Sequence, residues 1–106
     1  MTAENQNFEV LEGDHNRIIF EVKNVDVGDV DKIFWYAGEI EKTLEDGSIT
    51  IDEEKNEIIL DLENEETHGR AGRIQHELKI VDIFGNISTL SQGKMIVKEP
   101  KRVIEA

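Results

Sequence analysis

Apolar and polar residues alternate along most of this chain, in short runs separated by turn-forming residues. Within residues 16–24, Ile18, Phe20 and Val22 fall on one face of the run, whereas Glu21 and Lys23 fall on the other. A two-residue period of this kind is typical of a half-buried β-strand. The same pattern predicts further strands within residues 8–12, 32–38, 44–52, 56–64, 73–81, 86–90 and 94–98.

About seven or eight short strands with turns between them predict an all-β sandwich. We expect residues 1–106 to form a single domain, with residues 1–7 and 99–106 as flexible tails. Helix is nearly absent from the pattern. Residues 63–70 predict one helical turn closed by Gly69. Residues 39–46 are a second candidate for a turn, but they lack an amphipathic stripe.

The inward-facing positions of these runs supply a hydrophobic core. At roughly 1.5–3 kcal/mol for each fully buried side chain, they can offset the entropy lost on ordering a small domain. Trp35 is the expected anchor, provided that its indole N–H finds an acceptor. The predicted core residues are Ile18, Phe20, Val22, Ile33, Trp35, Ile58, Leu60, Leu62, Leu78, Ile80, Met95 and Val97.

The charge balance narrows the classes of partner. Twenty-four acidic residues against twelve basic ones give a formal net charge of −12, which repels phosphate backbones and anionic membranes. We therefore expect neither nucleic acid nor a membrane as a partner. The chain has no cysteine, no apolar run approaching the roughly 20 residues of a membrane span, and no signal-peptide pattern at its start, so the cytoplasm is the expected compartment.

Templates for catalysis do not fit the sequence. None of its serines lies in a nucleophile elbow, and its glycines lack the strand–loop–helix context of a phosphate-binding loop. The histidines, His15, His68 and His76, are scattered over a turn, a loop and a strand. His76 shares a face with Leu78, so we expect a partly buried histidine with one satisfied nitrogen. The prediction is a protein that is not an enzyme and has no cofactor.

Acidic loops leave calcium as the one metal to consider. The run "DVGDVDK" provides Asp26, Asp29 and Asp31 as weak calcium candidates, and residues 52–54 form a second acidic run. Calcium takes six to eight oxygen ligands, which adjacent loops of a sandwich can supply. Neither run has EF-hand spacing, and in so acidic a chain such clusters are usually solvated loop faces.

Residues 11–98 contain a series of turn and strand positions, namely Gly13-Asp14, Glu66-Thr67, Gly72, His76-Glu77-Leu78, Asp82, Gly85, Ser88-Thr89, Gly93 and Val97. This series resembles a recurrent pattern in small structural proteins of tailed bacteriophages, namely the N-terminal immunoglobulin-like domain of baseplate upper proteins and related tail or neck proteins. The sequence departs from that pattern at His15, at Ile74 and in the lead-in "GRAGR".

This resemblance implies an immunoglobulin-like antiparallel β-sandwich with a structural role and no catalytic residue. It implies a subunit or adaptor of a phage or prophage virion, in the tail or baseplate, with other virion proteins as partners and a homo-oligomeric state. The protein would be found in the host cytoplasm during assembly and then in the virion. The alternative is a stand-alone immunoglobulin-like binding module for a carbohydrate or cell-surface partner, assisted by calcium.

Two regions of the sequence bear on these roles. In residues 76–97, Asp82 can cap a turn at Gly85-Asn86, and Gly93 permits a bulge or a close approach, so the segment predicts a hairpin without a site. The interface candidates are the outward aromatics Phe34 and Tyr36 together with Val103 and Ile104. For the two aromatics, the alternative is coverage by a neighbouring loop of the same chain.

Overall fold

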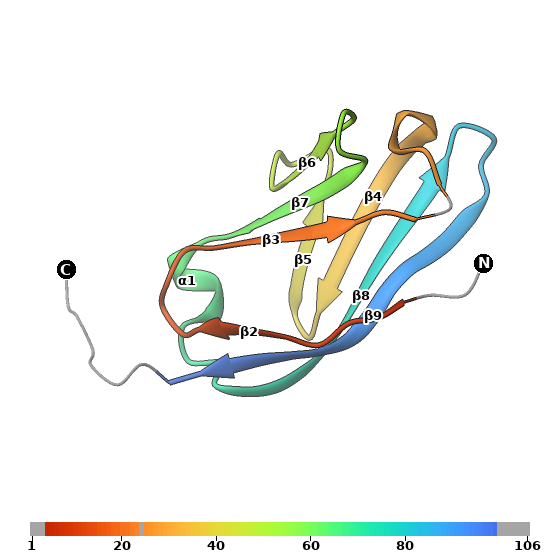
Figure 1. The fold of residues 1–106 in the computed structure, drawn as a ribbon. Helices are drawn as coiled ribbons and strands as arrows, with labels where there is room; N and C mark the ends of the chain where they lie inside the picture. Colours follow the sequence, from red (N-terminus) through yellow and green to blue (C-terminus); the bar gives the residue numbers. More distant parts are fainter. Residues whose placement is uncertain (1–3, 24, 100–106) are drawn as a thin grey trace.

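The structure is a computed structural model that describes residues 4–23 and 25–99, and its elements are almost all β-strands. Figure 1 shows the strands arranged in two layers. Their bounds are β1 (Glu4–Asn5), β2 (Phe8–Leu11), β3 (Asn16–Glu21), β4 (Val30–Ala37), β5 (Ile40–Thr43), β6 (Ile49–Asp52), β7 (Glu57–Leu62), β8 (Gly72–Asp82) and β9 (Ile87–Lys98).

The strands form two hydrogen-bonded sheets. The larger sheet has the order β1-β9-β8-β4-β5, with β2 also paired to β9, and the smaller sheet has the order β3-β7-β6. The predicted all-β sandwich is therefore confirmed. The expectation of a purely antiparallel sandwich is wrong at one edge, because β1 and β2 both run parallel to β9. That parallel edge makes the larger sheet mixed.

The strand order is that of an immunoglobulin-like sandwich. In such folds one sheet contains the second, fourth and fifth strands of the domain, and the other contains the third, sixth and seventh. Here β3, β7 and β6 form the first set, while β4, β8 and β9 form the second, with β5 added beyond β4. The loops 22–29 and 83–86 and the β6–β7 turn, residues 53–56, consequently lie at one end of the sandwich (Figure 1).

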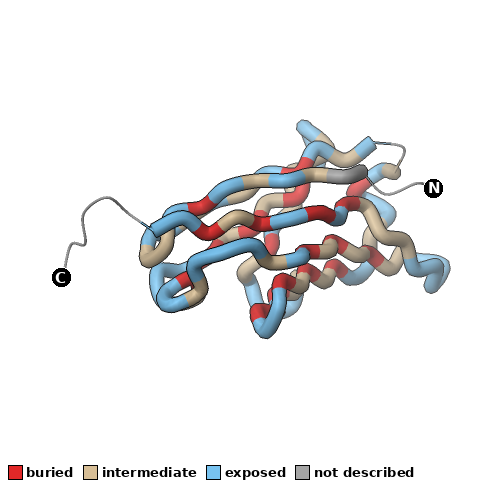
Figure 2. Tube along the Cα trace, turned by 90° about the horizontal axis from the view of Figure 1, so that it is seen from below, coloured by how far each residue is buried: buried red, intermediate tan, exposed pale blue. Residues whose placement is uncertain are grey.

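The predicted core fills the space between the sheets. All of the predicted core residues are buried except Ile18 and Val22, which are half-buried and pack against the others. Buried and exposed positions alternate along the strands, as Figure 2 shows for the trace viewed from below. The two-residue period in the sequence thus corresponds to the two faces of each strand.

Four rings meet at the centre of this core. Trp35 of β4, His76 of β8, Phe20 of β3 and Phe8 of β2 come from both sheets. The ring centroids of Phe8 and His76 lie 4.7 Å apart, and those of Trp35 and His76 lie 6.2 Å apart. The acceptor expected for Trp35 is missing among the described residues, since its buried Nε1 has no hydrogen-bond partner there. The cluster is held together by packing of the rings.

Two predictions about individual elements need correction. Residues 39–46, the second candidate for a turn, contain strand β5. The hydrophobic pattern did not predict this strand, because Lys42 occupies one of its inward positions. The ammonium group of Lys42 contacts the Glu66 carboxylate. Residues 86–90 and 94–98 were expected as two strands, but residues 87–98 form the single strand β9, which has an irregularity opposite Leu78 and Lys79, and Asn86 lies in the turn before it.

The helical content is small. The expected turn is present as α1 (Asn64–Thr67), and Gly69 after it adopts a φ of 76°. A 3-10 turn, η1 (Val27–Asp29), precedes β4. Within the described residues, neither helix has the length and apolar character needed to cross a membrane.

Candidate interaction surfaces

The turn between β8 and β9 is held rigidly by one carboxylate. Asp82 Oδ1 accepts hydrogen bonds from Phe84 N and Asn86 N, each at 2.9 Å, and Asn86 Nδ2 donates to Oδ2 at 3.2 Å. These N–H groups, with the Asn86 amide first, lower the pKa of Asp82 below its ordinary value. Gly85 takes a φ of 86°, as the sequence predicted, and Ile83 N donates to Asp29 O at 3.0 Å.

This rigid turn presents large apolar side chains to water. Phe84 is 81% exposed, Ile87 is 71% exposed and Ile83 is 59% exposed. Single exposed apolar residues are common on protein surfaces, but three within five positions at an ordered turn make it a candidate interaction site. We call these three residues the apolar tip. Because the Asp82 bonds already fix the backbone, little ordering entropy remains to oppose binding there.

The apolar tip was missed by the sequence analysis, which predicted a hairpin without a site. A signal was present in "DIFGNI", because Ile83 and Phe84 occupy turn positions where polar residues are usual. Two-residue periodicity does not extend into a turn and therefore assigns no face to these side chains. Their exposure became apparent only from the backbone of the turn.

The outward aromatics of β4 form a second surface. The rings of Phe34 and Tyr36 are stacked, with centroids 6.4 Å apart and planes at 5°, and both residues are half-buried. On β8 their cross-strand neighbours are Lys79 and Glu77. Lys79 Nζ lies 3.7 Å from Glu77 Oε2 and donates to Thr89 Oγ1 at 3.2 Å. Charged and polar groups therefore border this stack.

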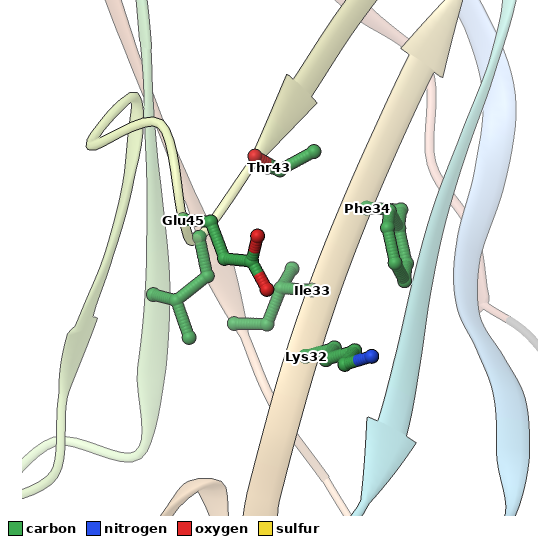
Figure 3. Close-up of a pocket in the computed structure, with 6 residues that line it drawn as sticks. Lys32, Ile33, Phe34, Thr43 and Glu45 are labelled. Atoms are coloured by element: carbon green, nitrogen blue, oxygen red, sulfur yellow. The ribbon is translucent and has the colours of Figure 1, made fainter.

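A small hollow lies beside Phe34 (Figure 3). Its volume is about 30 Å³, and the carboxylate of Glu45 and the side chain of Thr43 lie on its rim. This space is about the volume that one water molecule takes up in the liquid. The hollow is therefore too small for a metabolite or a sugar. Its lining residues are Lys32, Ile33, Phe34, Thr43, Leu44 and Glu45.

The calcium candidates do not come together as a ligand set. Asp26 Oδ1 accepts from Gly28 N at 2.9 Å and caps η1, while Asp29 is bonded through its backbone to Ile83. Asp31 is exposed at the start of β4. In residues 4–23 and 25–99, no three His, Cys, Asp or Glu side chains lie close enough to hold a metal ion.

His76 is fully buried, where its sequence context predicted partial burial, and one of its nitrogens is satisfied as expected. Its Nε2 lies 2.7 Å from Gln6 O, and since a carbonyl only accepts, Nε2 carries the proton. Its Nδ1 has no partner among the described residues. Burial lowers the pKa of His76, although the bond to Gln6 and the charge of Glu77 act in the opposite direction. The bond fastens the N-terminal segment to β8.

Val103 and Ile104, the other two interface candidates, lie outside the described residues. A scan against protein-family models gave no match to this chain, and neither did a search of curated proteins. The surfaces described above and the resemblance of residues 11–98 are therefore the observations that bear on function.

Proposed function

We propose that this domain is a non-enzymatic assembly subunit of a bacteriophage or prophage virion, in the tail or baseplate. The observation that carries the assembly role is the apolar tip on a turn fixed by Asp82. The virion and its location follow from the sequence resemblance. In this role the tip inserts into an apolar groove of another virion protein.

The free energy gained by burying the apolar tip is large enough to support such a contact. Burying an exposed phenylalanine contributes roughly 1.5–3 kcal/mol, so Phe84 alone can strengthen a complex about tenfold or more. The neighbouring Ile83 and Ile87 enlarge the apolar surface around it. A central apolar anchor surrounded by polar groups is the usual arrangement of a protein interface. Glu53 and Glu54 lie exposed in the β6–β7 turn, near the same end of the sandwich (Figure 1).

Incorporation into phage particles tests the proposal. In the phage that encodes the chain, we expect Phe84→Ser with Ile87→Ser to lower its amount in purified particles about tenfold, measured by quantitative mass spectrometry. Leu11→Ser is the matched control, because Leu11 is also an exposed apolar residue but lies on β2. Wild-type particles that lack the chain, or a tip variant incorporated as well as the wild type, would overturn the proposal.

A stand-alone binding module is the second candidate. It is favoured by the position of the tip, because three loops gather at this end of the sandwich, as the binding loops of variable domains do. The bond between Ile83 N and Asp29 O joins two of these loops into one surface. Binding to a glycan or cell surface that Phe84→Ser abolishes, with no chain in particles, would select this function.

A further inference from the structure

The outer edge of β3 is an unpaired strand edge. Val22 N donates to Asn56 O, and Asp61 N donates to Ser48 O on the far side of β7. Hydrogen-bonded pairs alternate along an antiparallel ladder. Because Val22 bonds to the β7 side, the other even-numbered residues of β3 also direct their backbone N–H and C=O groups towards β7. The N–H and C=O groups of Arg17, Ile19 and Glu21 point the other way, where no described strand pairs with them. Such an edge is a template for an added strand.

A hollow lies alongside this edge. It has a volume of about 190 Å³ and opens between β3 and the bend of the N-terminal segment. Ile18 and Phe20 of β3 line it, opposite Phe8. An added strand would therefore find a place for the side chains that it turns inward. The polar rim of the hollow is formed by Gln6 and Asn7.

The outward side chains of β3 give the edge a specific charge pattern. Arg17, with 62% of its side chain exposed, lies at one end, where its Nε also donates to Asp61 Oδ1 at 3.1 Å, and the exposed Glu21 lies at the other. Ile19 lies between them and is 53% exposed. A strand that placed like charges opposite Arg17 or Glu21 would be repelled, so these two charges select against most other strands. A matching strand needs a basic residue, an apolar residue and an acidic residue at alternate positions, in antiparallel order.

Residues 101–105 have this complementary pattern. Their sequence is "KRVIE", with charges of opposite sign at the two ends and an apolar residue between. Antiparallel alignment on β3 gives three outward pairs, Lys101 with Glu21, Val103 with Ile19 and Glu105 with Arg17. Ile104 then falls beside Ile18 and Arg102 beside Phe20, so both face the hollow, whose rim offers the polar Gln6 and Asn7. Cross-strand pairs of this kind each contribute roughly 0.2–1 kcal/mol.

The chain cannot place its own residues 101–105 in this register. Lys98 pairs with Leu11, whose carbonyl accepts from Asn16 Nδ2 at 3.4 Å, so β9 ends near the start of β3. Figure 1 shows β3 running away from that end. Glu21 lies five residues further along, or about 17 Å. The three residues from Lys98 to Lys101 span at most about 11 Å, and they would also have to reverse direction.

We propose that residues 101–105 of one copy add to the β3 edge of a second copy as an antiparallel strand. The contact links copies of the chain, and Lys101–Glu21 and Arg17–Glu105 set its register. It uses a face different from the apolar tip, so it does not depend on the proposed virion role. Variants of Phe84 and Ile87 leave this association unchanged.

Sedimentation velocity of the full chain tests this contact through charge reversal. We expect the wild type to self-associate with rising concentration, and Glu21→Lys or Lys101→Glu alone to weaken association about tenfold. The double variant Glu21→Lys with Lys101→Glu restores the opposite charges and should recover wild-type association. Glu53→Lys and Lys55→Glu are the matched controls, because these exposed residues lie in the β6–β7 turn and change the net charge equally.

A synthetic peptide of residues 99–106 provides a second measurement. We expect it to dissociate the full chain into monomers, whereas the peptide with Lys101 and Glu105 exchanged has no effect. A wild type that stays monomeric at all concentrations would overturn the proposal. So would a double charge reversal that associates no better than the single variants, or equal effects of the two peptides. Circular dichroism confirms that each variant is folded before its association is compared.

Discussion

At the scale of single residues, polar side chains inside the sandwich fix how its parts fit together. Lys42 and Glu66 join β5 to α1, and Thr67 Oγ1 accepts from Gly13 N at 3.0 Å. His76 fastens the N-terminal segment through Gln6, and Ser91 Oγ donates to Gln6 Oε1 at 2.6 Å. A hydrogen bond or ion pair is directional, whereas an apolar contact is not. Each of these side chains therefore fixes the position of one segment relative to another more narrowly than apolar packing would.

The titration of His76 makes stability depend on pH. Because burial lowers its pKa in the folded state, the unfolded chain, with a pKa near 6.5, binds the proton more readily. We expect the contribution of neutral His76 to the free energy of unfolding to be complete above about pH 6.5. Below that pH the free energy of unfolding should fall, by at most about 1.4 kcal/mol per pH unit, until the pH reaches the folded-state pKa. Urea denaturation between about pH 5.5 and 7.5 measures this slope.

Two variants isolate the contribution of this histidine. His76→Gln keeps a donor for Gln6 O but does not titrate, so the slope should disappear while the domain is less stable throughout. His68→Gln is the matched control, because it removes an exposed histidine outside the core. An unchanged slope in His76→Gln would show that another group carries the pH dependence.

At the scale of elements, the N-terminal segment is the part that differs most from a simple antiparallel sandwich. It bends at Gln6 and Asn7 between β1 and β2, and Gln6 N donates to Gln92 O at 2.7 Å. Asn7 Oδ1 accepts from Lys94 N at 2.8 Å. Between these two bonds lies Gly93, where the bend approaches β9 most closely. The expected role of Gly93 in a close approach is thus confirmed.

A side chain at position 93 should therefore be costly. The Cβ atom of an alanine there would lie 2.1 Å from Gln6 O, and the backbone φ is 152°. We expect Gly93→Ala to lower the free energy of unfolding by about 3 kcal/mol or more, measured by urea denaturation. Gly47→Ala is the control, because its φ of 84° is strained but no atom lies within 4 Å of the new Cβ. That variant should lose only about 1 kcal/mol, and equal losses would contradict the steric explanation.

The elements also show where sequence patterns stop being informative. Strands β3, β4, β7 and β8 could be predicted, because their buried positions hold apolar residues at every second place. Strand β5 could not, because the buried Lys42 is satisfied by a partner more than twenty positions away in the sequence. The parallel pairing of β2 with β9 was equally hidden, since alternation describes the faces of a strand and not the direction of its neighbour.

At the scale of the whole molecule, the net charge of −12 opposes the folded state. Acidic side chains are brought closer together on folding, and their mutual repulsion acts over about 10 Å at 0.1 M salt. Several ion pairs, such as Lys98 with Glu9 at 3.0 Å, offset part of it. Exposed pairs of this kind contribute little to stability, so the repulsion is largely uncompensated.

Salt should therefore stabilise the protein. We expect the melting temperature to rise by about 5 °C when NaCl is increased from about 10 mM to about 200 mM, measured by circular dichroism at low protein concentration. The variant Glu53→Lys with Glu54→Lys has a smaller net charge and should show a smaller rise. A melting temperature that falls with salt would mean that attractive ion pairs outweigh the repulsion.

The ring cluster at the centre of the sandwich has a practical consequence. At this place antibody domains join their two sheets with a disulfide bond that packs on a tryptophan. Here the rings of Phe20 and His76 face each other across the layers beside Trp35, with their centroids 6.4 Å apart. Because the chain has no cysteine, dithiothreitol has no disulfide bond to reduce and refolding needs no oxidant. The fluorescence of the single indole, which lies between the layers, reports directly whether the two sheets have come together.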